Sequence, residues 1–173
     1  MGGMHDLCHM EATLTSALSS LPAHARVWIY KSAVPFTPDQ LISLREKGAA
    51  FTGSWSSHGD AVLSAFDVLD DHFVVLAADL QDMTICGGAI DGSVQFIRKL
   101  EGELGLQLTD RMVVLYERDG RIRSCRATEV EGLLKSGELR ADTPVFDDLV
   151  ATKADLDARF RTPLRNTWLS RYL

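Results

Sequence analysis

Residues 62–79, VLSAFDVLDDHFVVLAAD, consist of two apolar runs that are separated by a short polar stretch. Val62 to Leu69 and His72 to Asp79 contain several Val and Phe residues, which are typical of strands. The Asp70-Asp71 pair between them is short enough for a hairpin, although Asn-Gly is the favoured dipeptide in such turns. This stretch therefore predicts two neighbouring antiparallel strands.

A strand and a helix are predicted before this hairpin. Arg26 to Lys31, with the sequence RVWIYK, has the β-branched and aromatic composition of a strand. The segment Thr37-Pro38-Asp39-Gln40 combines an N-cap threonine, a proline at the first helical position and a glutamine three residues after the cap. We therefore predict a helix that begins there and runs to about Gly53.

A second helix and a second hairpin are predicted after it. Asp91 or Ser93 can cap the start of this helix, and Gly105 is a typical C-terminal stop. Residues 112–117 and 121–126 then flank an Asp-Gly dipeptide, which is a strong hairpin signal because these residues tolerate positive φ.

The C-terminal part of the chain carries further helix signals. Thr128 to Glu131 is a second capping box, and the short helix that it opens is predicted to end at Gly137. Thr143 to Val150 is predicted as a strand or extended segment. Thr152 to Asp155 resembles another helix start, and Pro163 limits that helix.

This order of elements, β-α-β-β-α-β, predicts an α+β fold with a ferredoxin-like sheet, an added edge strand next to the fourth strand, and C-terminal helices. We expect residues 1–21 to be a flexible lead-in and residues 22–127 to be the sheet core. Residues 128–173 are predicted to form a helical extension docked on that core, within a single domain. The alternative is a three-layer α/β sandwich in which the C-terminal helices cover the second face of the sheet.

The composition is that of one globular domain. Of 173 residues, 46% are apolar and 24% are charged, which is enough to bury a core without disulfides. Three cysteines without a C-x-x-C pair disfavour a disulfide scaffold and a zinc ribbon. No secretory signal and no membrane-length apolar run is found, so we expect a cytoplasmic protein without a cofactor. The net charge of −6 makes nucleic acid an unlikely partner.

The glycine-rich segment from Ile85 to Ser93 is the first candidate site. Backbone N–H groups at a helix start can hold an anion and lower the pKa of Cys86, with Gly87, Gly88, Asp91 and Ser93 as the ligand-binding residues. The spacing matches neither the Walker A nor the dinucleotide signature. Residues 60–91 also contain seven aspartates and no Lys or Arg, which disfavours a phosphate. The alternative is that the two glycines only permit a tight turn and that Asp91 caps the helix.

Cys86 and His58 are the candidate catalytic pair. The predicted topology brings their loops to the same end of the sheet, which permits a meeting without predicting one. The alternative is a solvated histidine and an inert buried thiol. Trp55, together with Trp28, Tyr30 and Trp168, could line a binding surface, or these aromatic residues could belong to an ordinary core.

Three further patterns in the sequence could form binding sites. His5, Cys8 and His9 have spacings that suit a transition metal, and the aspartates of residues 60–91 could bind Mg²⁺ or Ca²⁺. A terminal segment and scattered acids seldom form such sites, so no metal site is predicted. The segment from Lys153 to Leu173 holds five bases, two acids and interleaved aromatic residues, which suit either RNA binding or docking on the acidic remainder of the chain. Docking is the simpler prediction.

Several segments together resemble a family of small uncharacterised bacterial proteins whose members often carry the label "ABC transporter ATPase". These segments are residues 26–30, 55–59, 88–96 and 143–153, together with Trp168. The resemblance brings no established activity and no assigned catalytic residue. The label itself does not fit, because the sequence has neither a Walker A lysine loop nor a segment like L-S-G-G-Q. ATP hydrolysis is therefore rejected.

The function predicted from these patterns is a non-catalytic module that binds a small molecule or a protein and forms a homo-oligomer. An open ferredoxin-like sheet would leave an edge and one face for a partner or a second copy. The first alternative is a thiol-dependent enzyme that uses Cys86 at the glycine-rich helix start. The second is RNA binding through the basic and aromatic C-terminal segment.

Overall fold

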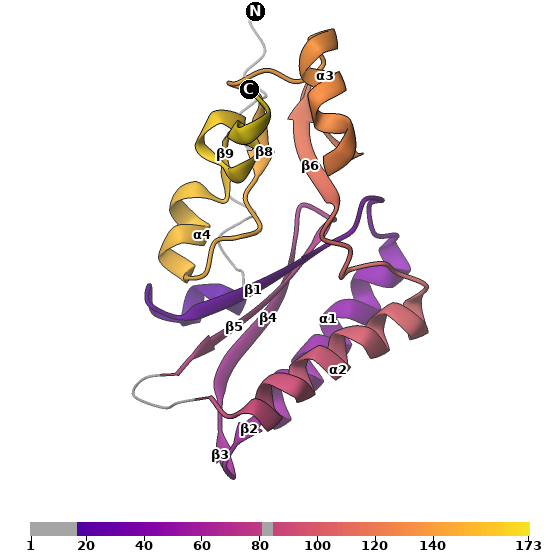
Figure 1. Cartoon of the computed structure of the whole chain (residues 1–173). Helices are drawn as coiled ribbons and strands as arrows, with labels where there is room; N and C mark the ends of the chain where they lie inside the picture. The colour runs from indigo at the N-terminus through magenta and orange to yellow at the C-terminus, as the bar shows by residue number, and fades with distance from the viewer. Residues whose placement is uncertain (1–16, 81–84) are drawn as a thin grey trace, which may run out of the picture.

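The computed structural model describes residues 17–80 and 85–173 and shows a mixed α/β protein with antiparallel sheets (Figure 1). In chain order, with η for 3₁₀-helices, the elements are η1 (Ala17–Ser20), β1 (Arg26–Lys31), α1 (Pro38–Ser54), β2 (Ser56–Ser57), β3 (Asp60–Ala61), β4 (Leu63–Leu69), β5 (Phe73–Asp79), α2 (Gly87–Leu104), β6 (Val113–Arg118), β7 (Arg121–Arg126), η2 (Ala127–Glu129), α3 (Val130–Ser136), β8 (Pro144–Phe146), α4 (Lys153–Arg159), β9 (Arg161–Pro163), η3 (Leu164–Asn166) and η4 (Trp168–Tyr172). This pattern confirms an α+β architecture.

The predicted hairpin of residues 62–79 supplies two strands of the N-terminal sheet, whose order is β1-β5-β4, with β5 in the centre. β4 pairs with β5 in antiparallel register, from Leu63 opposite Asp79 to Leu69 opposite Phe73. Asp70 and Asp71, in the connection, have φ values of 50° and 54°. The turn thus uses the left-handed region without glycine, which Asp tolerates better than most residues.

Both faces of the N-terminal sheet are covered, because alternate residues of β5 point to opposite sides and every residue of β5 is buried. One core lies between this sheet and helices α1 and α2; its members include Leu44, Phe66, Val74, Leu76, Ile97 and Leu100. The other core lies on the opposite face; its members include Phe73, Val75, Ala77, Val113, Leu115, Leu156 and Phe160. The open face expected from the sequence is therefore not found.

Helix α1 approaches the N-terminal sheet closely at a glycine. A Cβ atom placed on Gly48 would lie 2.0 Å from Cδ1 of Phe66, which is on β4. The helix start is the predicted one, because the Thr37 hydroxyl accepts the N–H of Gln40 and the Gln40 side chain accepts the N–H of Thr37. The capping box therefore fixes the position of Gly48 against the sheet.

Helix α2 begins earlier than the sequence indicates. Its N-cap is Cys86, and its first turn contains Gly87 and Gly88, so neither Asp91 nor Ser93 caps it and the two glycines do not form a tight turn. The sulfur of Cys86 accepts the N–H of Ala89, which supplies the contact that a hydroxyl or carboxylate supplies at most helix starts. The predicted end is confirmed, since Gly105 is the C-cap with φ 65°.

Strands β6 to β9 form a separate C-terminal sheet with the order β7-β6-β8-β9, and β2 and β3 pair only with each other among the described strands. A single ferredoxin-like sheet would place β6 beside β1, and this arrangement is not confirmed. The outer edge of β1 is occupied instead: the N–H of Val27 donates to the carbonyl of Ala151 at 3.0 Å, and that of Lys31 donates to the carbonyl of Leu108 at 3.3 Å. β6 pairs with β7, as the Asp-Gly turn predicts, and with β8 on its other side.

The strand predicted within Thr143 to Val150 is confirmed as β8, whereas β9 adds a strand to a part of residues 128–173 that is predicted to be helical. Helix α3 begins at Val130 after a 3₁₀ turn rather than at Thr128, and it ends at Gly137 as predicted. Thr152 caps α4 as predicted, with its hydroxyl accepting the N–H of Asp155. Leu156 and Phe160 cover the second face of the N-terminal sheet, which is the position that the sandwich alternative gave to the C-terminal helices.

The C-terminal segment is packed against the protein. Leu164 and Leu169 are buried in a third core, and Trp168 and Tyr172 pack against that core. Arg161 forms an ion pair of 2.6 Å with Glu117 on β6. Residues 17–21, predicted to belong to the lead-in, bury Leu18 and Leu21, whereas residues 1–16 lie outside the described part.

Candidate functional site

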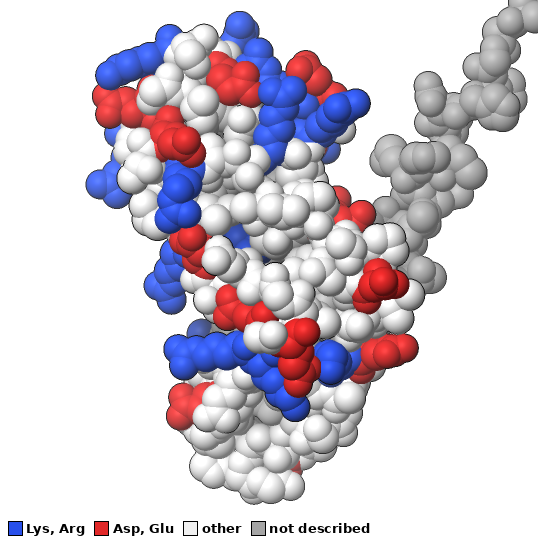
Figure 2. Space-filling view, turned by 90° about the vertical axis from the view of Figure 1, so that its right-hand side faces the viewer, with Lys and Arg blue, Asp and Glu red and all other residues white. Residues whose placement is uncertain are grey.

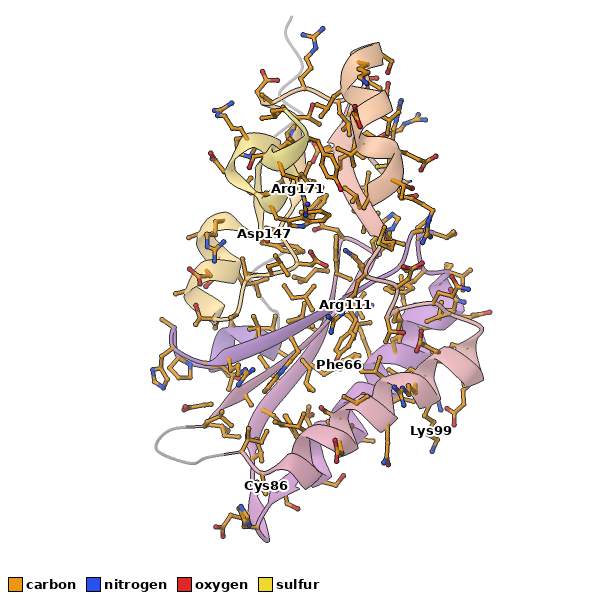
Figure 3. The ribbon with its side chains drawn as sticks, in the orientation of Figure 1. Phe66, Cys86, Lys99, Arg111, Asp147 and Arg171 are labelled. Carbon is orange, nitrogen blue, oxygen red and sulfur yellow. The ribbon has the colours of Figure 1, made fainter. Side chains whose placement is uncertain are left out.

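The candidate site lies where the short β2–β3 hairpin approaches the start of α2 (Figure 1). β2 and β3 pair antiparallel, with Ser57 opposite Asp60, and the turn between them is His58-Gly59 with φ values of 52° and 81°. Cys86 is at the N-terminal end of α2, in the lower part of the molecule as drawn in Figure 3. The site therefore joins residues that are almost thirty positions apart in the sequence.

Hydrogen bonds tie Cys86 to this hairpin and to its own helix. The backbone N–H of Cys86 donates to the Ser57 hydroxyl oxygen at 3.0 Å, and Ser57 is only 1% exposed. The sulfur of Cys86 accepts the N–H of Ala89 at 3.4 Å. Ser57 thus holds the residue that caps α2, and it does so from a separate element.

Hydrogen bonding at the sulfur lowers the pKa of the Cys86 thiol. The largest cause is a hydrogen bond with the Ser57 side chain, followed by the backbone N–H of Ala89; the backbone N–H groups of His58 and Gly88 add to them, and partial burial opposes them. Donors that point at the sulfur favour its charged form. The thiolate is therefore stabilised by dipoles rather than by a cationic side chain.

His58 takes part through its backbone and not through its ring. Its N–H contributes to lowering the Cys86 pKa, while its exposed side chain extends from a left-handed turn. Within the described residues, no contact joins the imidazole to the sulfur. The sequence thus brings the correct loop to Cys86, but the structure does not provide the predicted Cys–His pair.

The other predicted ligand-binding residues have structural positions. The Trp55 indole N–H donates to the carbonyl of Ala89 at 3.0 Å, and its ring makes an edge contact with Trp28 at 5.9 Å between centroids. The buried Ser93 hydroxyl donates to the carbonyl of Ile90. Asp91 is exposed on the second turn of α2. Trp55 therefore anchors the first turn of the helix instead of lining an open surface.

Ser57 is the residue that sequence reasoning missed. It belongs to the polar stretch Trp55-Ser-Ser-His-Gly59, where attention falls on the histidine. Nothing in the local pattern separates Ser57 from its neighbour Ser56, yet Ser57 is buried and Ser56 is exposed. Only the pairing of β2 with β3 turns one of these two serines toward Cys86.

Cys125 provides a second thiol in a contrasting environment. It lies on β7, and burial together with the negative charge of Glu129 raises its pKa to about 11. Cys8, together with His5 and His9, lies outside the described residues. Among residues 17–80 and 85–173, no group of three or more His, Cys, Asp or Glu side chains is placed to hold a metal ion.

Surface hollows occur elsewhere on the molecule. An open hollow of about 520 Å³ lies between α3 and the C-terminal residues, and one of about 270 Å³ lies between α1 and α2 beside the stacked rings of Phe51 and Phe96. Neither is lined by Cys86 or Ser57. No helix in the described part is long and apolar enough to cross a membrane.

Comparison with known proteins found no matching family model, no matching curated protein and no matching solved structure.

Proposed function

We propose that this protein is a thiol-dependent enzyme whose nucleophile is Cys86. The observation that carries this proposal is the position of the sulfur at the start of α2, where it accepts the N–H of Ala89, while Ser57 of the β2–β3 hairpin accepts the backbone N–H of Cys86 beside it. Both neighbours lower the pKa of the thiol. A thiolate, and not a thiol, is the reactive form of cysteine. A site that stabilises the thiolate lowers the free energy needed to deprotonate the thiol.

The proposed step needs no histidine base. The Cys86 thiol first releases its proton to water. The sulfur then uses its electron pair to form a bond with an electrophilic atom of the substrate, the bond from that atom to its leaving group breaks, and the leaving group departs with that pair and takes up a proton from solvent. The N–H groups at the start of α2 remain in place during this step, since they belong to a regular helix.

The two other hypotheses from the sequence have less support. The binding module relied on an open sheet face, but both faces of the N-terminal sheet are covered. RNA binding relied on free aromatic residues near the C-terminus, but Trp168 and Tyr172 pack against a core. Self-association remains a proposal that light scattering of the full chain would test.

The experiment is the rate of alkylation by iodoacetamide as a function of pH, measured for each cysteine by mass spectrometry in a Cys8→Ser background. We expect Cys86 to react with an apparent pKa below the ordinary thiol value and Cys125 to react only in strongly alkaline solution, because its pKa is about 11. At neutral pH the larger thiolate fraction of Cys86 outweighs the lower nucleophilicity of its thiolate, so Cys86 should react faster than Cys125 by about tenfold or more.

A matched pair of variants tests the cause. Ser57→Ala removes the side chain that contributes most to the lowered pKa of Cys86 and moves the alkylation profile of Cys86 to higher pH, whereas Ser56→Ala, at an exposed neighbour, leaves it in place. Circular dichroism checks that both variants are folded. An ordinary thiol pKa for Cys86 in the unmodified site, or identical profiles for the two serine variants, would overturn the proposal.

A further inference from the structure

Strand β7 is the exposed edge of the C-terminal sheet. It pairs only with β6 in the sheet order β7-β6-β8-β9, and within its sequence RIRSCR only Ile122 and Cys125 are half-buried while the rest is exposed. An edge strand presents unpaired backbone groups that can add another strand. This strand is six residues long, which is enough for such an addition.

The register shows which backbone groups are available. Arg118 lies opposite Arg121 across the two-residue Asp119-Gly120 turn, so the N–H groups of Arg121, Arg123 and Cys125 face β6. The N–H and C=O groups of Ile122 and Ser124 then face away from β6, and no hydrogen bond to them occurs within residues 17–80 and 85–173. The next N–H that faces away from β6 is that of Arg126. It donates to the Glu129 carboxylate and is therefore not available to an added strand.

Arginines are concentrated along this edge. Residues 111–126 contain five arginines and two acidic residues, and Figure 2 shows basic side chains interspersed with acidic ones over the upper part of the molecule, where this sheet lies. Three of these arginines already form ion pairs, Arg118 and Arg123 with Glu138 and Arg126 with Asp110. Arg111 and Arg121 have no ion-pair partner among the described residues.

We propose that β7 binds an extended acidic peptide, which adds to the C-terminal sheet as a further strand. The backbone of the peptide would pair with Ile122 and Ser124, and acidic side chains at alternate positions would meet Arg121 and Arg123, which lie on one face of β7. Charge complementarity selects this occupant. The same arginines repel a basic strand.

Two other occupants fit the edge less well. A second copy pairing through its own β7 would bring arginines opposite arginines, and like charges across a strand pair are destabilising. A single-stranded nucleic acid gains much of its affinity from stacking on aromatic rings, and β7 contains none. The proposal does not depend on the chemistry of Cys86, which lies in a different part of the fold.

The test measures fluorescence anisotropy of a labelled ten-residue peptide of alternating Glu and Val with the full chain. Its controls are a peptide of alternating Lys and Val, and an acidic peptide of equal charge that carries Pro at alternate positions and cannot form a strand. We expect binding of the Glu-Val peptide alone. Ser124→Pro removes one outward N–H, and Arg121→Glu reverses one charge, and each should weaken this binding by at least about fivefold.

Matched variants separate the edge from general effects. Ser124→Ala keeps the backbone N–H, and Arg140→Glu changes an exposed arginine outside β7, so both should bind the peptide as the unmodified chain does. Equal binding of the Pro-containing acidic peptide would overturn the proposal, because charge alone would then suffice. Preferential binding of an RNA oligonucleotide, or sedimentation that shows dimers abolished by Ser124→Pro, would overturn it in favour of another occupant.

Discussion

The two sheets are stabilised in different ways. The N-terminal sheet lies between two apolar layers, and its central strand β5 is buried from Phe73 to Asp79. In the C-terminal sheet β6 is also buried in apolar cores, but the outer strand β7 is exposed, and ion pairs of arginine with Glu138, Asp110 and Glu117 surround the sheet. Apolar burial contributes about 25 cal/mol per Å², whereas each exposed ion pair contributes little. Substitutions near the two sheets should therefore change the free energy of unfolding by different amounts, and these changes should depend differently on salt and on pH.

The largest effect is expected for Gly48→Ala on α1. The added Cβ would lie 2.0 Å from the Phe66 ring, so either the helix or the ring must move, and overpacking of this kind costs about 1–3 kcal/mol or more. Urea unfolding followed by circular dichroism measures the loss. Gly132→Ala on α3 is the matched control, since nothing lies within 4 Å of its Cβ, and it should gain up to about 1 kcal/mol. Equal effects for the two would break the comparison.

A smaller effect is expected for Glu138→Gln next to the C-terminal sheet. The Glu138 carboxylate forms ion pairs with the guanidinium groups of Arg118, at 3.0 Å, and Arg123, at 2.9 Å. The two arginine side chains are 37% and 43% exposed. Solvent screening limits such pairs, so the loss of unfolding free energy should be about 1 kcal/mol or less. It should shrink further in 1 M NaCl, where the Debye length is about 3 Å. A loss that does not change with salt would contradict an ionic origin.

The smallest effect is expected for Asp70→Asn, and it depends on pH. Burial raises the pKa of Asp70 above its ordinary value of 3.8, with Arg161 opposing and Asp71 and Glu117 assisting. A carboxyl with a raised pKa in the folded state keeps its proton there longer than in the unfolded chain. The unfolding free energy contributed by Asp70 is therefore present below pH 3.8 and declines as the pH rises through the folded-state value. Asp70→Asn removes this decline.

Urea midpoints of the unmodified chain and Asp70→Asn, compared between pH 3 and pH 7, measure this difference. The unfolding free energy of the variant, relative to that of the unmodified chain, should increase as the pH rises. Asn also tolerates the left-handed conformation at this position. Asp119→Asn in the other hairpin turn, where φ is also positive at 53°, is the control for the change of residue type. A relative loss of stability at pH 7 for Asp70→Asn would show that its charge is favourable.

Local signals in the sequence are sufficient for most of the secondary structure. The Thr37–Gln40 capping box, the Asp119-Gly120 turn and the Gly105 stop each act over a few residues, and all three are confirmed. The division into two sheets is not local. It depends on residues 108 and 151 reaching the edge of β1, and a one-dimensional pattern does not contain that contact.

The candidate site shows the same limit. The glycine-rich segment and Cys86 stand out in the sequence. Cysteine is an unusual N-cap, however, so the sequence pattern predicts a helix start several residues after the observed one. The Cys–His hypothesis brought the correct loops together, yet the side chain that contacts Cys86 is Ser57. Which of two adjacent serines faces the helix depends on strand pairing, and the composition of the loop does not reveal it.

The hydrogen bond from Trp55 to Ala89 gives the helix start an optical label. The indole N–H and the Cys86 sulfur both bond to backbone atoms of Ala89, one to its carbonyl and the other to its N–H. A change at the sulfur that displaces the backbone of Ala89 also alters the surroundings of the indole, whose emission responds to hydrogen bonding. Events at residue 86 are therefore visible in the fluorescence of the native chain without any attached dye.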